Sequence, residues 1–379
     1  MIPSTQRPTE ALVDLDAVAA NAQLLLKLAD GAELCAVVKA DGYGHGAVAA
    51  ARAALSGGAS RLAVATVDEG AVLRGNGVTA PIIVFGEPFE SELATIVDLG
   101  LDGVVARAGA IDALAARAEG GNPVRVHLCV DTGMHRAGCD PADAVDLARR
   151  ITERPSLRLA GTWTHFPRAD EADEDFTELQ VDRFLRVVAA IGDAGIDPGI
   201  RHAANSAGAM AHPSSRLDMV RCGIALYGIS PSKHLAGRHP LRPALTLRTA
   251  VVSVRLVPAG DGVSYGHRWR APTDTWVATL PIGYADGVTR RLGLAGGEVL
   301  IGGHRRPIAG VVTMDQTMVS CGSDPPQIGD EVVLIGSQDG TSVTAEEWAD
   351  RLDTIGYEVV CGISSRVPRR HVGTIADQP

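Results

Sequence analysis

Short apolar runs rich in β-branched residues alternate with amphipathic stretches between residues 33 and 230. Each run resembles a buried strand, and each amphipathic stretch has the spacing of a helix with one apolar face. Eight such units predict a (β/α)8 barrel of the TIM type. A doubly wound open sheet is the alternative, and two short helices allow the count to differ by one unit. The expected strands are 33–39, 61–67, 81–86, 101–106, 124–131, 158–165, 199–204 and 218–222.

The pattern changes after residue 240, where apolar and polar positions alternate and Gly, Pro and Asp fill the turns. A Thr-Ala-Glu-Glu start predicts one capped helix over 344–352. We therefore expect a barrel domain over 11–240 and a mainly β domain over 241–379. The first 14 residues are candidates for pairing with the β domain. Its expected strands are 245–257, 276–280, 298–301, 307–312 and 331–335.

Composition excludes several classes of function. A net charge of -10 over 379 residues, with only short arginine pairs, argues against a nucleic-acid partner. No apolar run approaches the roughly 20 residues of a membrane helix, and the N-terminus lacks the pattern of a secretory signal. The six scattered cysteines indicate reduced thiols and a cytoplasmic location. The 11 histidines show no metal-ligand spacing, so no metal site is expected.

Lys39 ends the first expected barrel strand, directly after the apolar run 34–38. Burial of a lysine charge is costly, and desolvation lowers the pKa of an amine and prepares it to attack a carbonyl. The position therefore fits a Schiff-base lysine. On this segment alone, a lysine whose head group reaches solvent past the strand end explains it equally well.

Polar residues also gather at other expected strand ends, where TIM barrels carry their reactive groups. The segments around Ser206 and Gly223 leave backbone N–H groups available to hold a phosphate. A lysine nucleophile, a phosphate cradle and an arginine together suggest pyridoxal phosphate (PLP). The strand-end residues are Lys39, Asp131 followed by Arg136, His165, Asn205, Ser206, Arg221 and Gly223.

Eight segments, in order along nearly the whole chain, resemble motifs of the alanine racemases. The resemblance implies a PLP-dependent racemase of fold type III, a homodimer whose active sites use residues of both subunits. It also implies conversion of L-alanine to D-alanine for peptidoglycan. The segments are AVVKADGYGHG with Lys39 and Tyr43, VDTGMHRAG with Arg136, THF with His165, ANSAG with Ser206, RCGIALYG from Arg221, VSYG with Tyr265, VTMDQTMV with Met314 and Asp315, and YEVVCGISSRVPR from Tyr357.

By this resemblance, Lys39 carries the cofactor and serves as acid or base on one face of the substrate Cα. Tyr265 of the partner subunit serves on the opposite face, because inverting a stereocentre by proton transfer needs a group on each side. Arg221 faces the pyridine nitrogen. An arginine does not give up its proton there, so the ring stays a weaker electron sink, which suits racemisation better than transamination.

The resemblance implies further binding roles. Arg136 holds the phenolic oxygen of the cofactor and the substrate carboxylate, Met314 offers that carboxylate its backbone N–H, and Asp315 orders the loop. His165 is expected to hydrogen-bond Arg221 or Tyr265. The cofactor-binding set is Lys39, Tyr43, His165, Asn205, Ser206, Arg221, Gly223, Ile224 and Tyr357. Structural alternatives stay open: a core histidine for His165, a helix cap for Ser206, an ion pair for Arg221, and packing for Tyr43, Tyr265 and Tyr357.

One position departs from the family pattern. Many relatives carry a carbamylated lysine two residues before the Asp-Thr-Gly-Met run, where this chain has Cys129. A cysteine is too short for that task, so we expect an anion such as chloride, or nothing, in the gap, and a small buried side chain rather than a catalytic thiol. Three other functions stay open: racemisation of serine or a larger amino acid, decarboxylation on the same fold, and a PLP carrier without activity.

Overall fold

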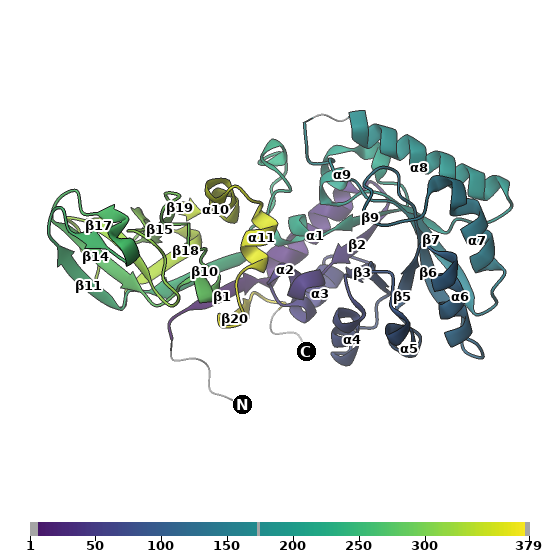
Figure 1. Cartoon of the computed structure of the whole chain (residues 1–379), viewed down its shortest axis with the longest axis horizontal. Helices are drawn as coiled ribbons and strands as arrows, with labels where there is room; N and C mark the ends of the chain where they lie inside the picture. The colour runs from purple at the N-terminus through teal and green to yellow at the C-terminus, as the bar shows by residue number, and fades with distance from the viewer. Residues whose placement is uncertain (1–6, 173–174, 376–379) are drawn as a thin grey trace. The chain divides into compact units, whose positions relative to one another are not determined.

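The computed structural model describes residues 7–172 and 175–375. The chain forms two compact units, one of Val18–Arg242 and one of Met1–Ala17 with Pro243–Pro379. Helices and strands of both units are labelled in Figure 1. No helix among the described residues combines the length and the apolar character that crossing a membrane requires.

The first unit is built on eight parallel strands in the order β8-β7-β6-β5-β4-β3-β2-β9. The N–H of Asp218 donates to the carbonyl of Arg201 (3.1 Å) and that of Arg221 to Ala204 (2.9 Å), so the two outer strands of the order also meet. The predicted barrel and its count of eight strands are confirmed. The strands are β2 (Glu33–Val37), β3 (Arg61–Val64), β4 (Ile82–Val84), β5 (Asp102–Val105), β6 (Val124–Cys129), β7 (Leu157–Trp163), β8 (Ile200–His202) and β9 (Met219–Cys222).

Amphipathic helices cover the outside of this ring, as Figure 1 shows for α4 to α8. In α7 the buried residues Ala144, Leu147, Ala148 and Ile151 recur at helical spacing, so one face of the helix packs inward and the other meets solvent. The helices are α1 (Leu15–Leu28), α3 (Ala47–Ser56), α4 (Val67–Gly75), α5 (Leu93–Asp98), α6 (Ala108–Arg117), α7 (Ala144–Thr152), α8 (Asp175–Asp193) and α9 (Ser206–Ala211).

The second unit is mainly β. Its largest sheet has the order β16-β15-β18-β10-β1-β20, with β19 on β18; β11, β14 and β17 form a second sheet, and β12 and β13 a third. The N-terminal β1 (Glu10–Asp14), purple in Figure 1, pairs with β10 and β20 of this unit. The other elements are β10 (Leu245–Ala250), β11 (Ser253–Val257), β12 (Gly262–Val263), β13 (Trp269–Arg270), β14 (Thr275–Leu280), β15 (Glu298–Ile301), β16 (His304–Pro307), β17 (Thr317–Gly322), β18 (Glu331–Gln338), β19 (Thr341–Val343), β20 (Arg369–Val372), α10 (Ala345–Leu352) and α11 (Gly356–Cys361).

Two strand predictions in this unit were wrong in detail. The run 245–257 is two strands, because Val251 bonds the backbone of Asp330 while Val252 bonds Thr279 in another sheet. The run 307–312 leaves the sheet after Pro307. At Gly310 the φ angle is 82°, and an added Cβ would lie 2.8 Å from a backbone carbonyl, so the chain turns there instead of continuing as a strand.

Candidate active site

Lys39 opens an unusual turn at the C-terminal end of β2. The segment α2 (Lys39–Tyr43) is not a right-handed helix, because φ is 51° at Ala40, 51° at Asp41, 62° at Gly42 and 53° at Tyr43. The N–H of Gly42 donates to the carbonyl of residue 38 at 2.9 Å, which closes one left-handed turn. Such a conformation is unfavourable for residues with a Cβ, so the surroundings must hold it in place.

Three segments of the barrel unit meet beside Tyr43. The N–H of Gly223 donates to Ser206 Oγ at 2.9 Å. A Cβ on Gly223 would lie 2.3 Å from Tyr43 Oη, so only glycine allows the phenol to approach this loop. Ile224 is 1% exposed, and none of the described residues accepts a hydrogen bond from its backbone N–H. The arrangement leaves a buried donor of the kind that an anion would satisfy.

Asn205 has a structural task in this region. Its Oδ1 accepts from the N–H of Gly208 at 2.9 Å, which caps the start of α9, and its Nδ2 donates to the carbonyl of Phe166 at 3.4 Å. These two bonds place Ser206 next to the Gly223 loop.

Arg221, on β9, is buried at 2% exposure and donates to four acceptors. Two are the carbonyls of Thr164 (2.8 Å) and Ala203 (3.0 Å), and two are the Nδ1 atoms of His165 and His202, both at 3.1 Å. Its Nε–H has no acceptor, and its charge no carboxylate partner, within the part of the chain that the structure describes. Burial lowers the pKa of Arg221 to about 10, so it keeps its charge at neutral pH.

A row of buried polar side chains, called the relay below, extends from Arg221 through His202 and His127 to Asp102 at the start of β5. His202 Nε2 lies 2.9 Å from His127 Nδ1, and His127 Nε2 lies 3.5 Å from Asp102 Oδ2. Because Arg221 can only donate, His202 Nδ1 must accept, so His202 donates from Nε2 to His127 Nδ1. The proton of His127 is then on Nε2, on the side of Asp102, although neither His127 Nε2 nor Asp102 Oδ2 has a hydrogen-bond partner among the described residues. Burial lowers the pKa of both histidines, so they stay neutral. The sequence interpretation missed these three residues, although each is a polar side chain in an apolar strand.

His165 continues the same hydrogen-bond pattern at the end of β7. Its Nδ1 accepts from Arg221, which leaves Nε2–H as the donor. Burial, and then the charges of Arg221, Arg136 and Lys39, hold the pKa of His165 well below its usual value. The imidazole is therefore neutral, and three cationic residues lie close enough to influence it.

The chemistry-bearing residues of the β unit lie on adjoining exposed loops. Tyr265 is 71% and Met314 52% exposed. Ser264 Oγ donates to the carbonyl of Val311 at 2.6 Å, which joins the two loops, and Asp315 forms an ion pair with Arg366 at 2.8 Å. Tyr284, 40% exposed, bonds the backbone of Thr313 and shares this surface, although the sequence interpretation did not single it out. Tyr357, half-buried, is on α11.

Comparisons with known proteins decide the family. A model of the alanine racemase N-terminal domain matches residues 13–231, and a model of the alanine racemase C-terminal domain matches residues 244–371. This chain belongs to the alanine racemase family. The resemblance inferred from the eight motifs is thereby confirmed.

Relatives match over almost the whole length. The alanine racemase of Symbiobacterium thermophilum is 46% identical over 377 residues, covering 98% of each chain, and that of Thermobifida fusca is 43% identical, covering 97% of this chain and 98% of its own. The alanine racemase from a D-cycloserine-producing Streptomyces lavendulae superposes with a TM-score of 0.92 at 39% identity, covering 98% of each chain. That of Bacillus anthracis with bound L-Ala-P gives 0.91 at 38%, covering 98% of this chain and 96% of its own.

Cys129, which the sequence analysis set apart from the other motif residues of this alanine racemase, is at the end of β6. The residue is 5% exposed, and burial raises the pKa of its thiol to about 12, so it is not a thiolate at neutral pH. It pairs in register with Trp163, whose buried Nε1–H has no partner among the described residues. Arg136, nearby on an exposed loop, forms no ion pair with any described residue.

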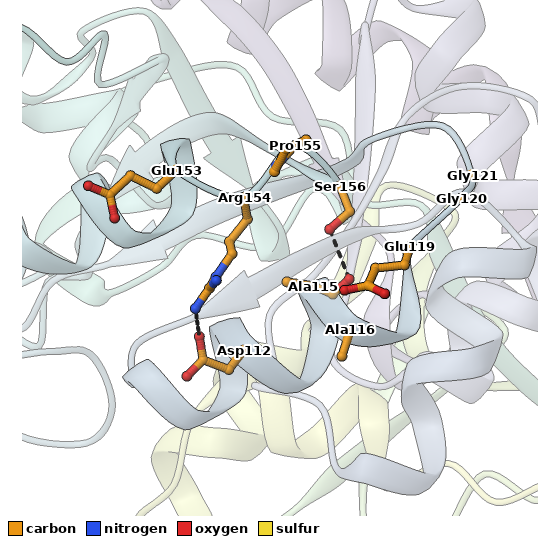
Figure 2. A pocket seen from close by; sticks show the side chains of 10 residues that line it. All are labelled: Asp112, Ala115, Ala116, Glu119, Gly120, Gly121, Glu153, Arg154, Pro155 and Ser156. Atoms are coloured by element: carbon orange, nitrogen blue, oxygen red, sulfur yellow. Dashed lines mark hydrogen bonds and ion pairs between the residues drawn. The ribbon is translucent and has the colours of Figure 1, made fainter.

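One hollow in this alanine racemase fold lies away from the candidate site. Figure 2 shows it between the end of α6 and the connection from α7 to β7, where Arg154 pairs with Asp112. Ser156 precedes β7 and Gly121 precedes β6, so the hollow is at the N-terminal ends of these strands. Lys39 and Arg221 lie at the opposite ends of their parallel strands, which is the side where TIM barrels place their chemistry.

Proposed function

We propose that this chain interconverts L- and D-alanine with the help of PLP. The proposal rests above all on the match, over 98% of both chains at 46% identity, to a protein named alanine racemase. The cluster at the strand ends of the barrel supports it, because Lys39, Arg221 and the Gly223 loop lie at the C-terminal edge of one parallel sheet. D-Alanine made in this way would supply peptidoglycan precursors. The six free cysteines support a cytoplasmic location, where thiols stay reduced.

The residues present fit PLP. The unpartnered N–H of Ile224, the Gly223 backbone and Ser206 Oγ would hold the phosphate together with Tyr43, and Tyr357 is proposed to complete this set. The free Nε–H of Arg221 is proposed to face the pyridine nitrogen. When bound, PLP supplies an electron sink for negative charge at the substrate Cα.

The residues of the chain would then move one proton on each face of the substrate. The amine of Lys39, which also carries the cofactor, takes or returns the proton of Cα on one side, and the phenol of Tyr265 does so on the other. Arg221 acts as a hydrogen-bond donor and not as an acid, because its pKa stays near 10. His165, neutral and held by Arg221, keeps the guanidinium oriented.

The substrate carboxylate needs cationic and N–H partners. Arg136 is exposed at the barrel mouth, and its loop is shaped by Asp131, whose Oδ1 accepts the N–H groups of Gly133, Met134 and His135 at 2.9–3.1 Å. We assign the carboxylate to Arg136 and to the backbone N–H of Met314, with Asp315 holding that loop through Arg366.

We further propose a homodimer with shared active sites. A phenol that is 71% exposed, as Tyr265 is, would work against bulk water if nothing covered it. Covering Tyr265 and Met314 with the barrel mouth of a partner subunit would desolvate both and would place Tyr265 opposite Lys39.

One experiment tests the reaction and its substrate. The purified PLP-loaded protein is incubated in D2O with L-alanine, L-serine and larger L-amino acids, while Cα deuteration and optical rotation are followed. We expect deuteration with inversion, fastest for alanine. Faster inversion of serine would assign a serine racemase, release of carbon dioxide a decarboxylase, and absence of exchange with every substrate a PLP carrier.

A further inference from the structure

We propose that Glu69 is a positioning residue for Lys39, because its carboxylate ties the left-handed turn that follows Lys39 to the start of α4. The proposal deepens the proposed function and rests on it for the role of Lys39 alone. The contacts that carry it belong entirely to the barrel unit.

The Glu69 carboxylate bridges two strand ends. Its Oε1 accepts the backbone N–H of Ala40 at 2.6 Å. Its Oε2 accepts the N–H groups of Ala65 (2.8 Å) and Thr66 (3.2 Å), which follow β3. Bonds of this kind to an ionised acceptor are stronger than bonds between neutral groups. One side chain therefore links the segment after β2 to the segment after β3.

This link orients the backbone of Lys39. The N–H of Ala40 belongs to the peptide plane that Lys39 begins, so fixing that N–H fixes the ψ angle of Lys39. On the other side, the carbonyl of Val38, which lies in the peptide plane before Lys39, accepts the N–H of Gly42 at 2.9 Å. With both neighbouring peptide planes held, the direction of the Lys39 Cα–Cβ bond is set.

The turn requires such support, because Ala40, Asp41 and Tyr43 all adopt positive φ although they carry a Cβ. Asp41 is held independently, since its Oδ1 accepts the N–H of Ala47 at 2.8 Å. Ala40 has Glu69 as its side-chain partner. Without it, relaxation of the turn would move the lysine amine, and a misplacement of about 1 Å can slow a reaction about 100-fold.

The Oε1 bond is separable from the ordinary capping of α4. Thr66 Oγ accepts the N–H of Glu69 at 3.3 Å, and Glu69 Oε2 returns to Thr66, which completes a capping box without Oε1. A glutamine at 69 keeps the shape of the side chain but turns an NH2 toward one of the two groups of N–H donors. Glu69→Gln therefore breaks the bridge, while Thr66→Ala weakens the cap and leaves the bridge in place.

Hydrogen exchange tests the bridge without reference to activity. In the PLP-loaded protein, we expect E69Q to speed amide exchange in peptides covering residues 38–46 at least tenfold, while T66A leaves those peptides unchanged and lowers Tm by about 2–4 °C. Glu92→Gln is the matched control, because Glu92 accepts the N–H of Phe89 at 2.8 Å in a similar cap that does not reach Lys39. Exchange that rises equally in E69Q and T66A would overturn the proposal.

Isotope effects test the consequence for Lys39. The equilibrium constant between enantiomers is one by symmetry, so we expect E69Q to lower kcat/KM by about 10–100-fold equally in both directions. The deuterium isotope effect should rise for the enantiomer whose Cα hydrogen faces Lys39 and fall for the other. A general structural loss would leave the ratio of the two isotope effects unchanged, which would refute the positioning role. If the parent protein shows no racemisation, the proposed function fails, and hydrogen exchange still decides the bridge.

Discussion

In the barrel unit, Arg221 is 2% exposed and gives hydrogen bonds to four acceptors, whereas in the β unit Tyr265 is 71% and Met314 52% exposed. Buried polar groups are held by the hydrogen bonds that they must form, and the four acceptors of Arg221 all belong to the barrel unit, so the chain itself sets the geometry of the barrel cluster. Exposed side chains on loops have no such constraint. The barrel residues are therefore organised within the chain, whereas the exposed residues of the β unit depend on the partner subunit that we propose.

The exposed half is nevertheless supported from behind. Asp286, fully buried, accepts the N–H of Gly283 at 3.0 Å and pairs with Arg7 at 2.8 Å. Arg366 lies 3.4 Å from the same carboxylate and also holds Asp315. The loops next to Met314 are thus anchored, while the side chains of Tyr265 and Met314 are exposed. The barrel cluster and the exposed loops thus differ in how their side chains are held, and variants in each unit can test this difference.

Removing one proton-transfer group from each unit has the largest expected effect. Lys39→Ala and Tyr265→Phe should each lower kcat by about 10²–10⁴-fold, since each substitution removes a proposed acid or base. Mixing the two inactive variants under conditions of subunit exchange should restore activity, because a mixed dimer contains one site with both native residues. Assays of each variant and of the mixture measure this directly.

The control for the barrel variant is Lys27→Ala, an exposed lysine on α1, which should keep full activity. Tyr265→Phe should leave Tm within about 2 °C, because exposed substitutions change stability little. A mixture that stays inactive despite demonstrated subunit exchange would contradict the shared site and would place both groups within one chain.

The hydrogen bonds of His202 with Arg221 and His127 should contribute measurably to the stability of the barrel unit. His202→Phe removes the acceptor of a buried charged donor, so the free energy of unfolding should fall by about 1–3 kcal/mol. His304→Gln, an exposed histidine of the β unit, should change it by less than about 0.5 kcal/mol. Urea denaturation of both variants measures the difference. Equal effects would show that the relay does not hold Arg221.

Mild acid should destabilise the barrel unit before it destabilises the β unit. Burial lowers the pKa of His202 and His165, so the unfolded state binds more protons once the pH falls below about 6.5. Their contribution to stability is complete above that pH and is lost as the pH falls toward their lower folded values. After correction for the intrinsic pH dependence of amide exchange, protection factors in β8 and β9 should fall between about pH 6.5 and about pH 5.

The β unit should respond only at lower pH. Burial raises the pKa of Glu10, but hydrogen bonds and charges from Arg248 and Arg370 outweigh it, and the net pKa is lowered. The stability this carboxylate provides is present above about pH 4.3 and is lost as the pH falls through its lower folded value. Protection factors in β1 and β10 should thus stay constant to about pH 4.5. Parallel acid responses of both units would contradict this separation.

Sequence alone predicted the barrel well, because most of its strands are short, largely apolar runs and most of its connections contain an amphipathic helix. It also located the residues now found around the Gly223 loop and Arg221, since these follow strand ends. It missed Asp102, His127 and His202, because each is one polar residue inside an apolar run, and only closing the barrel brings them into line.

The β unit was harder to predict for a physical reason. Where the chain changes sheets, at Val251 and Val252, the alternation shifts by one residue, but two adjacent apolar residues inside a β-rich run do not by themselves mark the end of a strand. The turn at Gly310 depends on a close backbone approach from Val263, which no local pattern records. Long-range contacts, rather than local preference, decide the structure there.

The anion site that we expect beside Cys129 has the smallest expected effect. Arg136 has no ion pair among described residues, and the Nε1–H of Trp163, paired in register with Cys129, has no partner there. Both groups would favour an anion, so replacing chloride by gluconate at constant ionic strength should raise KM for alanine about two- to tenfold, the equivalent of one hydrogen bond. Trp163→Phe should reduce this dependence, whereas Cys129→Ser should keep it. If the KM for alanine does not depend on chloride in any of the three proteins, no anion binds beside Cys129 and packing alone fills this position. Arg136 would then be oriented only when the proposed partner subunit covers it.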